Sequence, residues 1–426
     1  MPIVLSSGGS FTTSSFSGGV APRTLPVYLI DVAWSRTRSG VVTIGTSTIG
    51  SADQIGGLFS HYTFDSIKHD VKDLTITRGV AGQGGTATVG RCSLRLADPD
   101  GTYNPENAGS PLAPDVVPLR PLRVRATHGG LTYGLFFGFI TRIEHDPHRS
   151  AQETVIEAED FFHWLNVFRP VVGMGETTVG AAIGAILGAC GLTDPAYLAL
   201  DTGHRIPFVV ADGDRTALAL IGELLRADMG VFFVDGDGVV TYHDTARRYD
   251  PGAAPDTFAA STIGGARPAT DISTVRNGWT VNRQDADGQT VFSSTRIDTA
   301  TREPSVYGPR DDSLTSPYFD SDTRAESLAA FKVLLHKDPL DPASSVRLHN
   351  DDDTLITKQL ARDLGDTVAL SESLGGTSLT GWVDGVRHRI WQGGRFHEAD
   401  FTITRRRFTT FTIGTSTIGG SDVIGY

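Results

Sequence analysis

Short runs of β-branched and aromatic residues, each ended by a turn signal, constrain the possible fold most strongly. In the N-terminal part these runs occupy 26–34, 71–80, 87–98, 120–128, 133–146 and 152–160. Turn-forming segments separate them, and the chain of 426 residues contains 49 Gly and 21 Pro. Strands at this spacing predict an antiparallel barrel or sandwich.

Two segments further along the chain have helical periodicity instead. In 176–192 the apolar residues recur every three or four positions, and Gly191 is placed to end the helix. The segment 321–339 has the same pattern, with Ser321 or Asp322 as its N-cap. We therefore expect α-helices at both places.

A third helix is predicted over 214–230, directly before a hairpin. Asp212 or Asp214 is positioned to cap this helix, and Gly230 to end it. The next run, 231–244, reads VFFVDGDGVVTYHD, in which two β-rich halves flank a turn sequence. This arrangement predicts a β-hairpin, with both glycines of the tip tolerating positive φ.

The C-terminal part returns to the β pattern. The runs 273–284 and 289–298 flank Asp285–Gly288 and predict a second hairpin. The whole chain therefore reads as a β-rich α+β protein. The predicted units are a flexible Ser/Gly-rich arm (1–25), a first β-barrel domain (26–160), an α/β domain (161–265), a second β-barrel domain (266–410) with the helix 321–338, and a C-terminal extension (411–426).

One internal repeat is long enough to require an explanation. TIGTSTIGSADQIG at 43–56 and TIGTSTIGGSDVIG at 412–425 are identical at eleven of fourteen positions. A short hairpin of this kind has too little apolar area to be stable alone, so it needs a sheet edge to pair with. We expect the terminal copy, through Ile413, Ile418 and Ile424, to act as an assembly segment by strand addition. Local covering of a barrel edge is the alternative.

Composition and motifs argue against several classes of function. The formal net charge is −12, whereas a protein that grips nucleic acid usually carries a basic patch. The two cysteines, Cys92 and Cys190, form neither a zinc pattern nor a disulfide framework. The sequence has no nucleophile elbow, metalloprotease, P-loop or dinucleotide-binding motif, and no apolar run of membrane-spanning length. We therefore expect no catalytic residues, no cofactor, no metal and no membrane span.

An acidic turn, DPDGTYNPEN, begins at Asp98 and invites comparison with a calcium loop. An EF-hand needs Gly at its sixth position and Glu at its twelfth, and this chain has Tyr103 and Gly109 there. The sequence instead predicts a structural turn. Asp98 and Asp100 would accept hydrogen bonds from backbone N–H groups, Gly101 would have positive φ, and Tyr103 would pack back on the barrel.

Two further polar features have ordinary structural interpretations. The acidic run Asp351–Asp353 is typical of a solvated loop. His145 and His148 lie three residues apart in a proline-containing turn and lack a third ligand for a metal site. Neither feature indicates a chemical function.

Three blocks of the sequence, in this order, resemble a known family. The first runs from ITRGVAGQGGTATVGRCSLRLADPDGTYNPENAGSPLAP (76–114) to PLRVRATHGGLTYGLFFGFITRIE (121–144). The second is the α/β stretch that ends in GVFFVDGDGVVTYHD. The third extends from LAAFKVLLHKDP through ARDLGDTVALSE (361–372) and WVDGVRHRI to TIGTSTIGGSD. Together they resemble the tail-hub or minor tail proteins of tailed bacteriophages, which are similar to the baseplate hub proteins of contractile tails.

The resemblance implies a structural role in the virion tail tip, after assembly in the host cytoplasm. It implies two tail-tube-like β-barrels with an intervening α/β region, so that a homotrimer imitates a ring of six. Its partners would be the distal tail or tail-tube ring proteins and other tail-tip proteins. During ejection DNA would pass through the lumen without specific binding, which the acidic net charge fits.

Two alternatives remain open from the residues. A glycan-binding adhesin or β-sandwich receptor-binding module would also explain the Gly/Thr-rich β composition, and it predicts a surface aromatic platform. A tail-associated cell-wall hydrolase would need a carboxylate pair or zinc ligands, and the sequence singles out neither.

Overall fold

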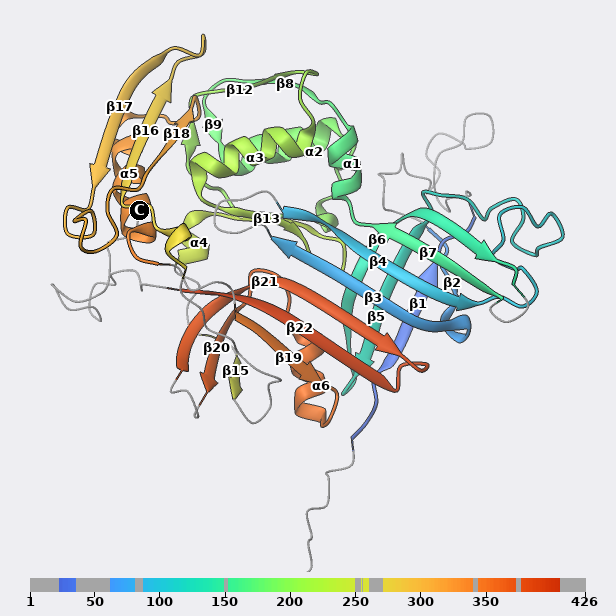
Figure 1. Cartoon of the computed structure of the whole chain (residues 1–426). Coiled ribbons are helices and arrows are strands. Elements are labelled where there is room, and N and C mark those ends of the chain that lie inside the picture. The colour runs from blue at the N-terminus through green and yellow to red at the C-terminus, as the bar shows by residue number, and fades with distance from the viewer. Residues whose placement is uncertain are drawn as a thin grey trace, which may run out of the picture.

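A computed structural model describes residues 23–35, 62–80, 87–148, 152–249, 254, 256–259, 271–339, 344–372 and 377–406. In these ranges the protein is a β-rich α+β molecule, as the sequence predicts. It contains one twelve-stranded mixed sheet and several sheets of two or three strands (Figure 1). The Ser/Gly-rich arm up to residue 22 and both copies of the TIG repeat, including Ile413, Ile418 and Ile424, lie outside the described residues.

The N-terminal strands follow the predicted β-like runs closely. They are β1 (Val27–Val32), β2 (Asp65–Ser66), β3 (Val71–Val80), β4 (Ala87–Ala97), β5 (Pro121–His128), β6 (Leu131–Asp146) and β7 (Glu153–Glu159), with a 3₁₀ turn η1 (Lys68–Asp70). Alternation along β7 shows how the sequence sets the two faces. Ile156 and Ala158 are buried, whereas Glu157 is exposed on the opposite face.

The C-terminal strands of the large sheet are β15 (Asp256–Ala259), β19 (Ser344–His349), β20 (Thr367–Glu372), β21 (Thr377–Trp391) and β22 (Phe396–Arg405). Strand β21 joins the two halves. Its first part pairs with β20 and its second part with β3, and the register shifts between Val383 and Gly385. In the described ranges the strand order is an open path, and neither half closes into a barrel.

Each half of the large sheet covers its own apolar core. The N-terminal core contains Leu74, Leu94 and Phe136 from the strands, together with Ile356. The C-terminal core contains Phe258, Val368 and Phe401 among others. The continuous sheet therefore curls over two separate cores.

An α/β module follows β7 and lies above the large sheet in Figure 1. Its elements are α1 (Phe162–Val167), β8 (Val171–Met174), β9 (Thr177–Thr178), α2 (Val179–Ala189), η2 (Pro195–Tyr197), β10 (Leu198–Leu200), β11 (Arg205–Ile206), β12 (Val209–Asp212), α3 (Ala217–Asp228), β13 (Val231–Val234), β14 (Val240–His243) and α4 (Thr245–Tyr249). The predicted hairpin is confirmed, because β13 and β14 pair antiparallel.

The predicted helices are present, but the ends of α3 differ from expectation. Its N-cap is Thr216, not Asp212 or Asp214, because the Thr216 hydroxyl directly precedes the helix and accepts from Ala219 N at 3.3 Å. The left-handed residue at its end is Met229, with φ of 65°, rather than Gly230. A side chain at Gly230 would instead collide with His243 O and Tyr242.

A third unit packs beside the α/β module and shares its core, to which Val281, Phe319 and Leu328 contribute. Its elements are η4 (Ile272–Thr274), β16 (Gly278–Gln284), β17 (Thr290–Ile297), β18 (Asp311–Ser316) and α5 (Asp322–His336). The second predicted hairpin is confirmed by the antiparallel pairing of β16 and β17. Helix α5 begins after Ser321, whose hydroxyl accepts from Arg324 N.

Helix α6 (Asp353–Ala361) was not predicted from the sequence. The acidic run Asp351–Asp353, expected to be a solvated loop, starts this helix instead. Asp352 is its N-cap and accepts from Leu355 N at 2.8 Å. Carboxylates just before a helix accept hydrogen bonds from its free N–H groups and interact favourably with the positive end of its dipole. The interpretation as a solvated loop did not take this capping role into account. No helix in the described part of the chain is long and apolar enough to cross a membrane.

Candidate functional site

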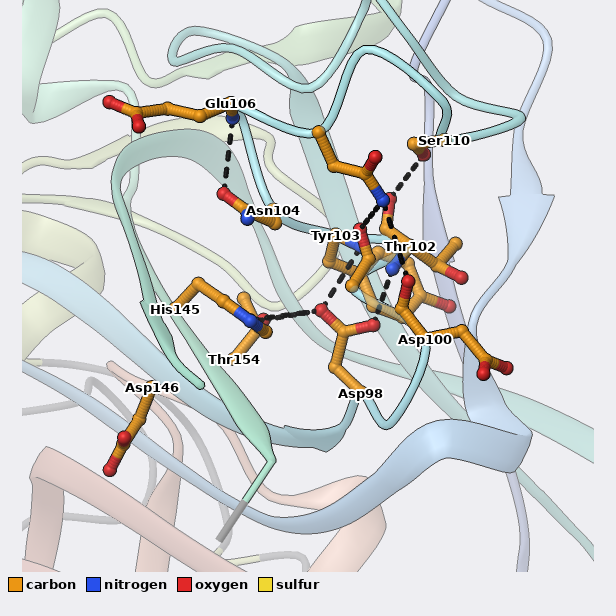
Figure 2. A network of polar contacts seen from close by, with 12 residues as sticks. Asp98, Asp100, Thr102, Tyr103, Asn104, Glu106, Ser110, His145, Asp146 and Thr154 are labelled. Carbon is orange, nitrogen blue, oxygen red and sulfur yellow. Dashed lines mark hydrogen bonds and ion pairs between the residues drawn. The ribbon is translucent and has the colours of Figure 1, made fainter. Parts of the chain in front are cut away.

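The turn that begins at Asp98 anchors a long loop between β4 and β5. Asp98 follows the last residue of β4 and is 2% exposed. Its Oδ1 accepts from Thr102 N at 2.6 Å, and its Oδ2 accepts from Tyr103 N at 3.2 Å (Figure 2). One carboxylate therefore organises the turn that follows it, as expected for an Asp at the start of a turn.

The same carboxylate ties the loop to two strands of the sheet. Thr154 on β7 donates from its Oγ1 to Asp98 Oδ2 at 2.7 Å. On β6, His145 Nδ1 lies 3.2 Å from the same oxygen and 2.9 Å from Thr154 Oγ1 (Figure 2). From the sequence, His145 was considered only as a metal ligand. In the structure it helps Asp98 to hold the loop between β4 and β5 in place.

The remaining residues of the turn behave differently from one another. Gly101 has φ of 64°, the left-handed conformation that the turn prediction required. Tyr103 is buried beside Trp34 and donates its hydroxyl hydrogen to Asp70; burial and this carboxylate raise its pKa. Asp100 departs from the expectation, because its side chain is exposed and it is its carbonyl oxygen that accepts, from Asn107 Nδ2.

Beyond Tyr103 the loop continues as a chain of tight turns. Backbone hydrogen bonds recur every three residues, from Asn104 N to Gly101 O and from Asn107 N to Asn104 O. Ser110 Oγ donates back to Thr102 O at 2.6 Å and closes the series. The loop therefore has an internal hydrogen-bond framework and presents a fixed polar surface, the character of a compact Ω-loop.

A second candidate surface is the polar face of the large sheet. Six adjacent strands (β19, β22, β21, β3, β4 and β7) contribute to it, and they come from both halves of the molecule. One row of paired residues across these strands reads Arg347, Asp400, Arg387, Thr77, Arg91 and Glu159. The next row reads His349, Glu398, Arg389, Thr75, Ser93 and Glu157.

Acidic and basic side chains lie side by side on this polar sheet face, and some of them form ion pairs. Arg347 Nε lies 2.6 Å from Asp400 Oδ1 and 3.4 Å from Glu398 Oε1. In the N-terminal half, Arg91 Nε lies 3.2 Å from Glu159 Oε1. In the N-terminal half, Thr75 and Thr77 of β3 help to line a hollow of about 300 Å³, which Arg91 and Glu159 also line. The face is therefore hydrophilic with charges of both signs.

Among the described residues, no group of three or more His, Cys, Asp or Glu side chains is placed to hold a metal ion. Cys92 and Cys190 are both buried. Burial raises the pKa of both thiols, that of Cys190 to about 11. A raised thiol pKa opposes formation of the nucleophilic thiolate.

No family model matches this sequence, and no curated protein matches it. Solved structures are similar in fold. A tail protein from Neisseria meningitidis MC58 superposes with a TM-score of 0.56 at 10% identity, covering 89% of this chain and 96% of its own. The 43 kDa tail protein of prophage MuSo2 from Shewanella oneidensis gives a TM-score of 0.51 at 12% identity, covering 81% and 96%. The chain therefore has the fold of these tail proteins, as the sequence resemblance predicts.

Proposed function

We propose that this chain is a structural hub protein of a bacteriophage tail tip. Three copies would form a pseudo-sixfold ring that joins the tail tube to a threefold tip and leaves a channel for DNA. The protein would act in the virion tail after assembly in the host cytoplasm. Its neighbours would be the distal tail or tail-tube ring proteins and other tail-tip proteins.

The observation that carries this proposal is the joining of two curled halves by β21. Each half covers a core of its own, and the pairing of β21 with β3 makes them one continuous sheet. Two such tube-like units in one chain allow three chains to supply six units around a closed ring. The fold shared with two tail proteins, one of them from a prophage, supports this proposal.

The polar sheet face is the surface we assign to the channel. It spans both halves, as a lining shared by the two units must, and on it Arg91 and Arg347 pair with carboxylates of the same chain. Binding to a nucleic-acid backbone depends on unneutralised Lys and Arg. A face with charges of both signs would therefore hold DNA less strongly than a basic face and let it slide past.

We retain the units predicted from the sequence with two changes of boundary: β16–β18 and α5 leave the second unit, and β15, which pairs with β20, joins it. Because β16–β18 and α5 pack with the α/β module, the second tube-like unit would consist of β15 and β19–β22. The segment carrying Ile413, Ile418 and Ile424 remains our candidate for strand addition during assembly. Deleting 411–426 should leave the melting temperature unchanged and abolish incorporation into tails. A lowered melting temperature would instead make the segment part of the chain's own fold.

We take the role to be structural rather than catalytic. The Asp98 turn (Asp98, Asp100, Gly101 and Tyr103) would then hold a loop surface for neighbouring proteins. Purified protein should not clear host cell walls. Clearing that is lost on a single Asp→Asn change would contradict a structural role.

The alternative, a glycan-binding adhesin, is favoured by one observation. Trp391 and Phe396 stack at 5.4 Å at the edge of the polar sheet face, and the Arg389 guanidinium lies 5.1 Å from the Trp391 ring centroid. Negative-stain imaging and oligomeric mass separate the two functions. A threefold ring supports the hub, and a monomer whose binding to host glycans requires Trp391 supports the adhesin.

A further inference from the structure

The tip of the β13–β14 hairpin lies where three parts of the molecule meet. Its residues Asp235–Gly238 belong to the α/β module. Asp363, which follows α6 in the C-terminal part, accepts through Oδ2 from Gly236 N at 2.8 Å. Its other oxygen lies 2.6 Å from Arg78 Nη1 on β3 of the N-terminal half. One carboxylate therefore links the hairpin tip to both halves of the large sheet.

Close packing adds to this link. A side chain at Gly236 would overlap the carbonyl of Gly134 on β6, and one at Gly238 would overlap the ring of Phe137. Arg78 also donates to Val234 O at 3.3 Å, and its side chain is 2% exposed. The tip is thus seated in a fitted contact rather than resting on a loose surface.

The charges at this contact are unbalanced. Arg78 faces the carboxylates of Asp363, Asp235 and Asp237, and also Asp160, which is buried behind it. Arg125 on β5 is the further cation that faces Asp237. In the described surroundings of the tip, carboxylates therefore outnumber guanidinium groups.

We propose that the hairpin tip Asp235–Gly238 is a releasable latch that fastens the α/β module to the large sheet. Asp363 and Arg78 hold it closed, and the crowding of carboxylates around Arg78 loosens it when they all carry charge. The latch does not depend on the tail-hub role, because it follows from contacts within one chain.

The ionisation of Asp235 determines how the strength of this latch changes with pH. Burial, followed by the charges of Asp363 and Asp237, raises its pKa to about 6 against the lowering effect of Val239 N and Arg78. When the tip is released, the pKa of Asp235 returns toward the ordinary value for Asp. The closed latch therefore binds a proton more tightly than the open one and weakens as pH rises from about 4 to 6.

Hydrogen exchange of the full chain at pH 5, 6 and 7, followed by mass spectrometry, tests the latch. The reporter is the segment 231–243, and the exposed hairpin around Asp285–Gly288 in the same molecule corrects for the intrinsic pH dependence of exchange. Exchange of the tip relative to this reference should rise roughly tenfold between pH 5 and 7. Equal profiles for the two hairpins would overturn the proposal.

Matched variants identify the group responsible. Asp235→Asn keeps an oxygen for the turn hydrogen bonds and should remove most of the relative rise, whereas Asp285→Asn should leave it intact. Asp237→Asn changes an exposed side chain and should reduce the rise by removing one of the charges next to Asp235. If Asp235→Asn does not fold, Asp237→Asn is the variant that tests the latch. An undiminished rise in either tip variant would contradict the latch.

Discussion

The two Asp-x-Asp-Gly hairpins of this protein have the same local structure in different surroundings. In the first, Asp235 Oδ1 accepts from Asp237 N at 2.9 Å and from Val239 N at 2.8 Å. In the second, Asp285 Oδ1 accepts from Asp287 N at 3.0 Å and from Gln289 N at 2.8 Å. Local sequence therefore determines the turn in both places.

The surroundings decide what each turn does. The first tip packs against Gly134 and Phe137 and is held by Asp363, whereas a side chain at Gly288 of the second would meet open space. The difference is visible at one position, Gly236 in the first turn and Ala286 in the second. Gly236 is absent from the positive-φ positions, so it is needed for close approach rather than for the turn conformation.

The largest effect should come from exchanging this one position. Gly236→Ala gives the first tip the sequence of the second, and its new methyl group would overlap the backbone of Gly134. We expect a loss of about 3 kcal/mol in the free energy of unfolding. Ala286→Gly is the reverse exchange and should stay within about 0.5 kcal/mol. Urea unfolding measures both changes in stability, and equal losses would contradict the role of Gly236 in close packing.

A buried histidine pair should give a pH dependence opposite to that of the Asp235 tip, because a histidine gains a positive charge when it is protonated. His388 Nδ1 lies 2.9 Å from His397 Nε2, and both rings are buried. Burial lowers the pKa of His397 to about 3, and burial with the neighbouring His397 and Arg78 lowers that of His388. As pH falls, the unfolded state therefore binds protons at a higher pH than the folded state does. The free energy of unfolding has its full value above about pH 6.5 and decreases below it.

Each histidine should contribute a loss of about 2 kcal/mol between pH 7.5 and pH 5. His397→Met removes one titration and should reduce the fall by about that amount, whereas His349→Gln, at an exposed residue, should leave the fall unchanged. Thermal or urea unfolding across this pH range supplies the measurement. A slope that both variants share with the wild type would show that the pair is not responsible.

Gly101 tests a turn whose glycine is needed for its conformation. With φ of 64°, it should not accept a β-branched residue. Gly101→Val should cost about 1.5 kcal/mol, and Gly101→Asn should cost less because Asn tolerates the left-handed region. Unfolding curves of the two variants check this order, and a Val variant as stable as the Asn variant would contradict it.

The smallest effect belongs to the exposed ion pairs of the polar sheet face. Arg347 pairs with Asp400, but about half of its side chain is exposed. Arg347→Gln should therefore change stability by less than about 1 kcal/mol at 0.15 M salt. A larger loss would mean that this face contributes to folding rather than serving as a solvent-facing surface.

The sequence was most informative where structure is local. Both hairpins, the helices at 176–192, 214–230 and 321–339, and the conformation of Gly101 follow from short-range patterns. The pairing of β21 with β3 joins residues some 300 positions apart, and no local pattern encodes it. The roles of Arg78 and Asp363 were missed for the same reason, although glycines at 134 and 236 are a signal of close backbone approach.

A tail reconstruction in which this chain is located would decide whether it forms a trimeric hub around a channel. We expect three copies in one ring, with Thr75, Thr77 and Arg387 of the polar sheet face turned toward the channel. One copy or six copies per ring, or this face buried against another protein, would contradict it.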